Sequence, residues 1–382
     1  MATIIRLPNV NREVGDQREM GNSQYNLMFP LSAAQQRIWR ADRRQPGNPA
    51  HNCAFRWKLD GQLDADLVER AFNEIVARHE ILRATFSQIG VEPIQIIAPS
   101  LELRIGRDDL SHLSSAERES ALEDLCRGEA SNCFDIGTGP LIRVKLIRTE
   151  ERQHYLLLTL HLLVGDGWSI RVIMTEFRSL YGSLAIGQSS TLPDLVLQYP
   201  DFVVWQREQR PLKELQQQLA YWKSKLAGYR QLEVPADLPP PKELTRASDI
   251  VALELPRELT DALNALGHRQ GGTMFTTALA ACKALLFRYT GRTDIAIGSE
   301  LVGRNRIELE PLVGLFINHV VFRTDVSGNS HFAELAERVR DTTLEIFANQ
   351  DIAFEDVLES MAAEGIELPE PFAQINFNCY RA

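Results

Sequence analysis

One short segment carries residues that could do acid–base chemistry. It reads His161-Leu-Leu-Val-Gly-Asp166-Gly167 and ends an apolar run that is typical of a strand buried on both faces. A histidine at a strand end, with a carboxylate after it, can act as a general base whose orientation a glycine turn fixes. The same pattern fits a buried histidine that only packs, so the residues alone leave both interpretations open.

The flanking sequence predicts the elements that would position this segment. Residues 155–163 form the apolar run, and hydrophobic residues return at helical spacing over 168–180. Further upstream, residues 53–59 are expected to form a strand and residues 64–78 an amphipathic helix. Strands and helices therefore alternate, which indicates a mixed α/β fold of the α+β type.

Composition and charge exclude several classes of protein. The 382 residues are 44% hydrophobic and 24% charged, as in ordinary globular proteins. A formal charge of −10, without a basic run, disfavours nucleic acid and anionic lipid as partners. The five cysteines are scattered and the histidines lack metal-ligand spacing. We therefore expect a cytoplasmic protein with no metal site and, since no apolar stretch approaches ~20 residues, no membrane span.

A proline-rich stretch divides the chain into two regions. Before it the chain is charged and helix-prone, and after it a second set of strands and helices begins with a strand near 250–255. Two lobes of similar size imply a cleft. The expected organisation is a flexible N-terminal segment, an N-terminal lobe that carries the histidine loop, a linker and a C-terminal lobe, over residues 1–24, 25–205, 206–245 and 246–382.

The histidine segment resembles a motif of a known family. It is similar to the H-H-x-x-x-D-G motif of the condensation domains of nonribosomal peptide synthetases, in the wider acyl-CoA-dependent acyltransferase superfamily. The chain also resembles the family's other motifs in the same order, at residues 31–39, 78–86, 199–205, 313–318, 349–355 and 371–378. The resemblance spans nearly the whole chain.

The resemblance implies a fold, an activity and partners. The fold would be two chloramphenicol-acetyltransferase-like lobes in a V-shaped pseudo-dimer with a central tunnel. Donor and acceptor peptidyl carrier proteins would bring acyl and aminoacyl groups into the tunnel on phosphopantetheine arms. The domain would join these groups by an amide bond and bind no cofactor itself. The domain would also contact neighbouring synthetase domains and would serve antibiotic or siderophore biosynthesis.

The resemblance also implies roles for individual residues. In the family the second histidine of the motif lies beside the acceptor amine and positions it or takes its proton, whereas the first is mostly structural. The aspartate holds the loop by pairing with an arginine, so Asp166 would pair with Arg304. The remaining candidates, for the loop, the tunnel or structural roles, are Gly167, Trp168, Ser169, Asn318 and His319.

The chain departs from the family at the catalytic position. Alignment on Asp166-Gly167 places His161 at the first histidine and Leu162 at the second. Leucine cannot accept a proton, and His161 cannot simply replace the missing group, because neighbours on a strand point to opposite faces. Three explanations stay open: lost condensation, a deliberate substitution, or chemistry that uses another group such as His319.

Three functions are consistent with these residues, which leave open whether the chain is an active enzyme. The leading interpretation is a condensation domain with impaired or altered catalysis. The alternative is a non-catalytic condensation-like module that docks a carrier protein or a tailoring enzyme. A stand-alone acyltransferase that uses coenzyme A ranks last. The strands and helix that usually follow the last motif are missing from the sequence, so we expect a C-terminal lobe that is either shortened or naturally brief.

Overall fold

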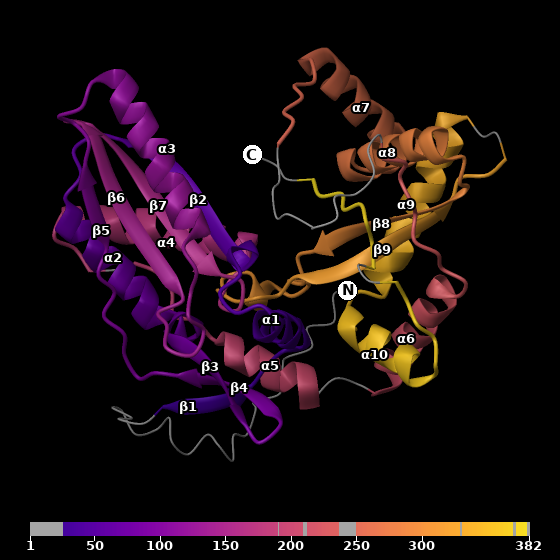
Figure 1. The fold of residues 1–382 in the computed structure, drawn as a ribbon, viewed down its shortest axis with the longest axis horizontal. Coiled ribbons are helices and arrows are strands. Elements are labelled where there is room, and N and C mark those ends of the chain that lie inside the picture. Colours follow the sequence, from indigo (N-terminus) through magenta and orange to yellow (C-terminus); the bar gives the residue numbers. More distant parts are fainter. Residues whose placement is uncertain are drawn as a thin grey trace. The chain divides into compact units, whose positions relative to one another are not determined.

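The computed structural model divides the chain into two compact units (Figure 1). Unit 1 comprises Met1–Pro211 and Arg304–Ile317, and unit 2 comprises Leu212–Gly303 and Asn318–Ala382. The structure describes residues 26–189, 191–208, 212–236, 250–328, 331–369 and 372–379. The predicted N-terminal segment 1–24 and part of the predicted linker, 237–245, lie outside these described residues.

Unit 1 contains two sheets. The larger has the strand order β2-β7-β6-β5, formed by β2 (Asn52–Asp60), β7 (Gln153–His161), β6 (Ile142–Glu150) and β5 (Gly106–Asp109). Its pairs are antiparallel except β5 with β6, which run parallel. The smaller sheet is antiparallel and has the order β1-β4-β3, from β1 (Leu27–Pro30), β4 (Glu92–Ile97) and β3 (Ala84–Ile89).

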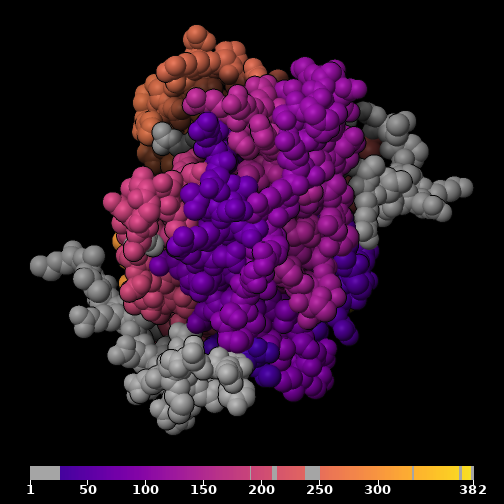
Figure 2. Space-filling view, turned by 90° about the vertical axis from the view of Figure 1, so that its left-hand side faces the viewer, coloured from indigo at the N-terminus to yellow at the C-terminus, as the bar shows by residue number. Residues whose placement is uncertain are grey.

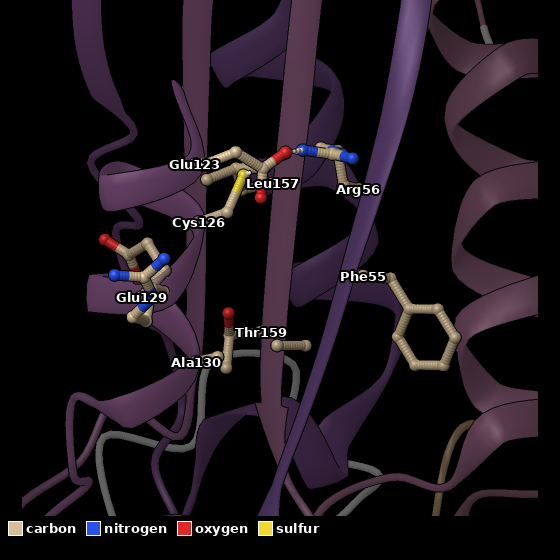
Figure 3. A pocket seen from close by; sticks show the side chains of 10 residues that line it. Phe55, Arg56, Glu123, Cys126, Glu129, Ala130, Leu157 and Thr159 are labelled. Atoms are coloured by element: carbon tan, nitrogen blue, oxygen red, sulfur yellow. Dashed lines mark hydrogen bonds and ion pairs between the residues drawn. The ribbon is translucent and has the colours of Figure 1, made fainter. Parts of the chain in front are cut away.

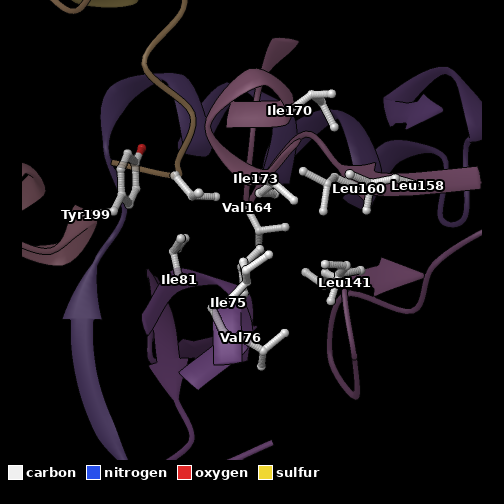
Figure 4. Packing of buried hydrophobic residues seen from close by; sticks show 14 of the residues in the cluster. Ile75, Val76, Ile81, Leu141, Leu158, Leu160, Val164, Ile170, Ile173 and Tyr199 are labelled. Carbon is white, nitrogen blue, oxygen red and sulfur yellow. The ribbon is translucent and has the colours of Figure 1, made fainter. Parts of the chain in front are cut away.

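The helices of unit 1 cover both faces of the larger sheet. Leu158 and Leu160 of β7 pack in the main core with Ile75 and Ile173, which belong to α2 and α4 (Figure 4). Leu157 points the other way and packs against α3. Every residue of β7 from 156 to 161 is buried, as the apolar run predicted. The helices are α1 (Ala33–Arg44), α2 (Ala65–Arg78), α3 (Ser115–Ser131), α4 (Gly167–Ala185) and α5 (Tyr199–Glu208), with short 3₁₀ helices at Pro49–His51, Glu80–Arg83 and Ile307–Leu309.

The surface of unit 1 is continuous over these elements. In the space-filling view the residues coloured indigo to magenta form one closely packed face (Figure 2). Strand β2 contributes much of the exposed part of its sheet, since residues 54–56 are all exposed. In the described part of the chain, no helix is long and apolar enough to cross a bilayer.

Unit 2 is built on a two-stranded antiparallel sheet of β8 (Asp294–Leu301) and β9 (Asn318–Asp325). Between these strands the chain leaves unit 2, because residues 304–317 pack with unit 1. The predicted C-terminal lobe, residues 246–382, included this segment, whereas the structure assigns residues 304–317 to unit 1. The helices of unit 2 are α6 (Leu212–Leu226), α7 (Arg257–Arg269), α8 (Met274–Thr290), α9 (Phe332–Ala348) and α10 (Phe354–Ala363). The predicted mixed α/β class is confirmed.

A lysine lies in the core of unit 2. Lys283 of α8 is fully buried, and its Nζ donates hydrogen bonds to the carbonyl oxygens of Phe322 (2.5 Å) and Ile295 (3.2 Å) and to Oγ1 of Thr324 (2.9 Å). Burial, and then the charge of Lys225, lower the pKa of Lys283 to about 7. The core of unit 2 is therefore sensitive to the charge of this group.

We expect the free energy of unfolding to rise between about pH 7 and pH 10 because of Lys283. Its folded pKa of about 7 lies below the ordinary value of 10.5, so the unfolded state binds more protons in this window. Urea unfolding at several pH values should show this rise in the natural protein and lose it in Lys283→Met. At about pH 10, where this gain is complete, the variant should also be less stable by about 1–3 kcal/mol, because two carbonyls lose their donor. The same pH dependence in both proteins would contradict the prediction.

Candidate functional site

The histidine segment forms the turn between β7 and α4. His161 is the last residue of β7, and Asp166 is the N-cap of α4. Oδ1 of Asp166 accepts hydrogen bonds from the backbone N–H (2.9 Å) and hydroxyl (2.8 Å) of Ser169. The Ser169 hydroxyl oxygen in turn accepts from the Asp166 N–H at 3.2 Å. This reciprocal capping box fixes the end of the turn.

Asp166 also forms a buried ion pair with Arg304. The guanidinium binds both carboxylate oxygens, with Nη1 to Oδ2 at 2.8 Å and Nη2 to Oδ1 at 3.1 Å, and both side chains are 1% exposed. The Phe316 N–H donates to Oδ2 at 3.1 Å, and the Arg304 guanidinium lies 4.1 Å from the centre of the Phe316 ring. The structure thus contains the pairing that the family resemblance implied, and it ties residues 304–317 to the turn.

Other motif segments join the same network. The Tyr199 hydroxyl donates to the carbonyl oxygen of Leu315 at 2.8 Å and lies 3.0 Å from the Ser32 hydroxyl. The Gln35 amide donates to the carbonyl oxygen of Leu163 at 2.9 Å. These polar side chains are all buried, so their bonds form in a medium of low dielectric constant. Segments far apart in the sequence therefore hold the turn rigidly.

Gly314 belongs to this network and has no space for a side chain. A Cβ atom at this position would lie 2.0 Å from Cδ2 of Tyr199. Its N–H donates to the Ser169 hydroxyl at 3.1 Å, and its carbonyl oxygen lies 2.9 Å from the same hydroxyl oxygen. The close approach of Gly314 to the Tyr199 ring is therefore a steric requirement of the site.

Gly314→Ala should lower the free energy of unfolding by roughly 1–3 kcal/mol or more, because the new methyl group overlaps the Tyr199 ring. Gly167→Ala is the matched control, since no atom lies within 4 Å of a Cβ built there. We expect the control to change stability by less than about 0.5 kcal/mol. Urea unfolding of both variants measures the difference, and equal effects would rule out the steric explanation.

His161 is held in a structural position. It is 2% exposed, and its Nδ1 accepts a hydrogen bond from the Leu163 N–H at 3.2 Å. Its ring packs edge-on against His51 and Phe134, with ring centroids 5.7 and 6.0 Å away. Burial, and then the charge of His51, lower the pKa of His161 to about 3. His161 therefore stays neutral near pH 7, which fits the structural role of the first motif histidine.

Leu162 lies beside a histidine that the sequence analysis missed. Its partly buried side chain packs against the core of unit 1, and its N–H donates to the carbonyl oxygen of His51 at 2.9 Å. A ring nitrogen of His51 lies within 4.8 Å of a ring nitrogen of His161 and of a carboxylate oxygen of Asp42. No sequence spacing links these residues; the fold brings them together from α1, from the 3₁₀ helix before β2 and from the end of β7.

Two histidines and one carboxylate are a common set of metal ligands. Here the Leu163 N–H donates to Nδ1 of His161, which places the proton of the neutral ring on Nε2. Coordination through Nε2 would cost this hydrogen bond, whereas metal-bound histidines normally donate from the other nitrogen. The donor set therefore does not favour a metal, and the absence of a metal site stays a prediction.

The remaining predicted residues have separate surroundings. Trp168 is partly buried, and its Nε1 donates to the carbonyl oxygen of Glu310 at 2.9 Å. Asn318 and His319 begin β9 and belong to unit 2. The Asn318 amide donates to the carbonyl oxygen of Ile352 at 2.8 Å, and Nε2 of His319 lies 3.5 Å from a carboxylate oxygen of Glu300. Asn318 thus supports the loop before α10, and His319 pairs across the sheet.

A pocket of about 300 Å³ lies elsewhere in unit 1, between α3 and the strands β2 and β7. Arg56 Nη1 lies 2.6 Å from a Glu123 carboxylate oxygen in its wall, and Phe55 points away from Cys126 (Figure 3). The lining includes none of the predicted site residues. The turn after β7 therefore remains the candidate site.

The chain matches a family model described as "Condensation domain" over residues 26–380. It is 42% identical over 350 residues to a linear gramicidin synthase protein of Brevibacillus parabrevis, and the match covers 91% of this chain and 4% of that protein. It is 35% identical over 349 residues to phosphinothricin tripeptide synthetase PhsC of Streptomyces viridochromogenes, covering 91% of this chain and 32% of that protein. The chain thus spans a small part of the curated relatives that it matches.

Solved structures share the fold. The X-domain from teicoplanin biosynthesis is 28% identical, with a TM-score of 0.76 over 87% of this chain and 73% of that chain. The complex of the X-domain and OxyB from the same biosynthesis gives 27% identity and a TM-score of 0.75, over 90% and 74% of the two chains. The first condensation domain of the CDA synthetase, at 20% identity and a TM-score of 0.72 over 88% and 79%, shows the fold alone.

Proposed function

Because this chain belongs to the condensation-domain family, we propose that it joins an acyl or aminoacyl donor to an aminoacyl acceptor by an amide bond in nonribosomal peptide biosynthesis. The family match over residues 26–380 carries this proposal. Donor and acceptor peptidyl carrier proteins deliver both groups on phosphopantetheine arms, and the domain itself binds no cofactor. It works in the cytoplasm beside other synthetase domains.

The proposed reaction needs little from the protein besides positioning and proton transfer. The acceptor amine attacks the carbonyl carbon of the donor thioester, so a C–N bond forms and the C–S bond breaks. The amine loses one proton, and the departing thiolate gains one. Holding both arms in place can supply a large effective molarity. Leu162 offers no proton acceptor at the expected base position, so we expect catalysis that is impaired or altered.

Mass spectrometry of carrier-bound products tests this function. Donor carriers loaded with N-acetylated aminoacyl groups and acceptor carriers loaded with free aminoacyl groups, over all proteinogenic side chains, are incubated with the chain. We expect an amide on the acceptor carrier that does not form when the chain is omitted. Product formation at the same rate without the chain would contradict the proposal.

The second candidate is a non-catalytic module that docks another protein. Two observations favour it: the apolar Leu162 at the expected base position, and the likeness to an X-domain whose structure is known in complex with OxyB. A docking module should yield no amide, either as it stands or with histidine at position 162. The product measurement therefore separates the two functions.

A further inference from the structure

A backbone hydrogen bond joins His51 to Leu162. The last pair of the antiparallel β2–β7 ladder is Asn52 with His161, and His51 ends the 3₁₀ helix just before β2. The Leu162 N–H donates to the carbonyl oxygen of His51 at 2.9 Å, and the His51 ring packs edge-on against the His161 ring with centroids 5.7 Å apart. An imidazole therefore lies beside the turn whose second motif position lacks one.

The surroundings of His51 suit a proton acceptor better than those of His161. Nδ1 of His51 is buried and makes no hydrogen bond with the described residues, whereas Nδ1 of His161 is bound by the Leu163 N–H. The side chain of His51 is only partly buried, while His161 is 2% exposed. Of these two histidines, only His51 is not fully buried.

The charges around His51 favour its neutral form before reaction and tolerate its charged form during reaction. Burial lowers its pKa below the ordinary 6.5, the nearby Asp42 raises it and Arg37 lowers it. Asp42 and Arg37 face His51 from α1, and the neutral His161 faces it from β7. Near pH 7 the ring therefore keeps a free lone pair, and the Asp42 carboxylate stabilises the imidazolium once it forms.

We propose that His51 is the general base of the condensation, supplying from β2's side the imidazole that Leu162 does not provide. This rests on the proposed function. As the amine nitrogen bonds to the thioester carbonyl carbon, a ring nitrogen of His51 takes the proton of that nitrogen. The imidazolium then returns a proton to the departing pantetheine sulfur. The products are one amide and one free thiol, and His51 is neutral again.

A cycle of four proteins tests this role: the natural chain, His51→Gln, Leu162→His and the double variant. We expect His51→Gln to slow amide formation about 10²–10⁴-fold, the usual size of general-base help. The natural chain should lose rate at pH values below the His51 pKa, and His51→Gln should not show this loss. With histidine at position 162, His51→Gln should have little effect. His112→Gln, at an exposed histidine in a turn of unit 1, is the matched control and should leave the rate unchanged.

Chemical rescue separates proton transfer from a purely structural role. His51→Gly should regain part of its rate when free imidazole is added, which a packing defect would not do. Equal rates for the natural chain and His51→Gln would overturn the proposal, as would an equal loss in both Leu162 backgrounds. If Leu162→His forms amide and the natural chain forms none, the role of His51 as general base is overturned but the proposed function is not. If neither protein forms amide, the proposed function is overturned as well.

Discussion

Leu162→His is expected to raise the rate of amide formation, by roughly 10-fold to at most the 10⁴-fold that general-base catalysis supplies. The substitution returns a proton acceptor to the second position of the motif, on a turn that the Asp166–Arg304 pair already holds. Leu162 is partly buried, so an imidazole there keeps contact with solvent. Because His51 is proposed to act as a general base already, we expect a gain in rate toward the lower end of this range. Initial rates with the same loaded carriers measure it.

Leu162→Met is the matched control, because methionine has a similar volume and accepts no proton. We expect it to leave the rate of amide formation unchanged. Circular dichroism and urea unfolding should show that all three proteins fold alike. A gain in the methionine variant equal to that in the histidine variant would mean that packing, and not proton transfer, limits the reaction.

Much of the site could be predicted because its residues lie close together in the sequence. The run at 155–163 predicted a strand buried on both faces, and β7 is buried in this way. The hydrophobic spacing over 168–180 predicted a helix, and α4 begins there at Gly167, with Asp166 as its N-cap. The family resemblance is confirmed by the match over residues 26–380. Local chemistry and the ordered motifs therefore gave the class of fold and the turn.

The rest depends on contacts between distant segments. His51 was missed because it meets Leu162 only through a backbone hydrogen bond between distant segments, which no spacing in the sequence reveals. The strand expected near 250–255 is wrong: those residues form no strand, and the apolar Ile250, Val251 and Leu253 are exposed. The apolar residues there predicted a strand, but a strand needs a partner to bond with. Pairing partners, unlike propensity, are set by the whole fold.

Arg304→Met should destabilise unit 1 by about 3–5 kcal/mol, the cost of breaking a buried ion pair. Both side chains are 1% exposed, so solvent does not screen the charge that Asp166 would retain. Asp166 would keep the Ser169 and Phe316 donors but lose both bonds from the guanidinium. Residues 304–317 are bound to the turn through this pair. The loss of the ion pair should therefore loosen the site as well as the fold.

Urea unfolding of Arg304→Met, Asp166→Asn and the double variant measures this coupling. We expect the double variant to lose less than the sum of the single losses, because no unpaired charge then stays buried. The control is Arg257→Met, which breaks an exposed pair with Asp261 whose side chains are 92% and 68% exposed. Exposed pairs contribute little, so this variant should stay close to the natural protein. Additive losses at Asp166 and Arg304 would show that the two charges act independently, and that the segment 304–317 is held to unit 1 by its apolar contacts instead.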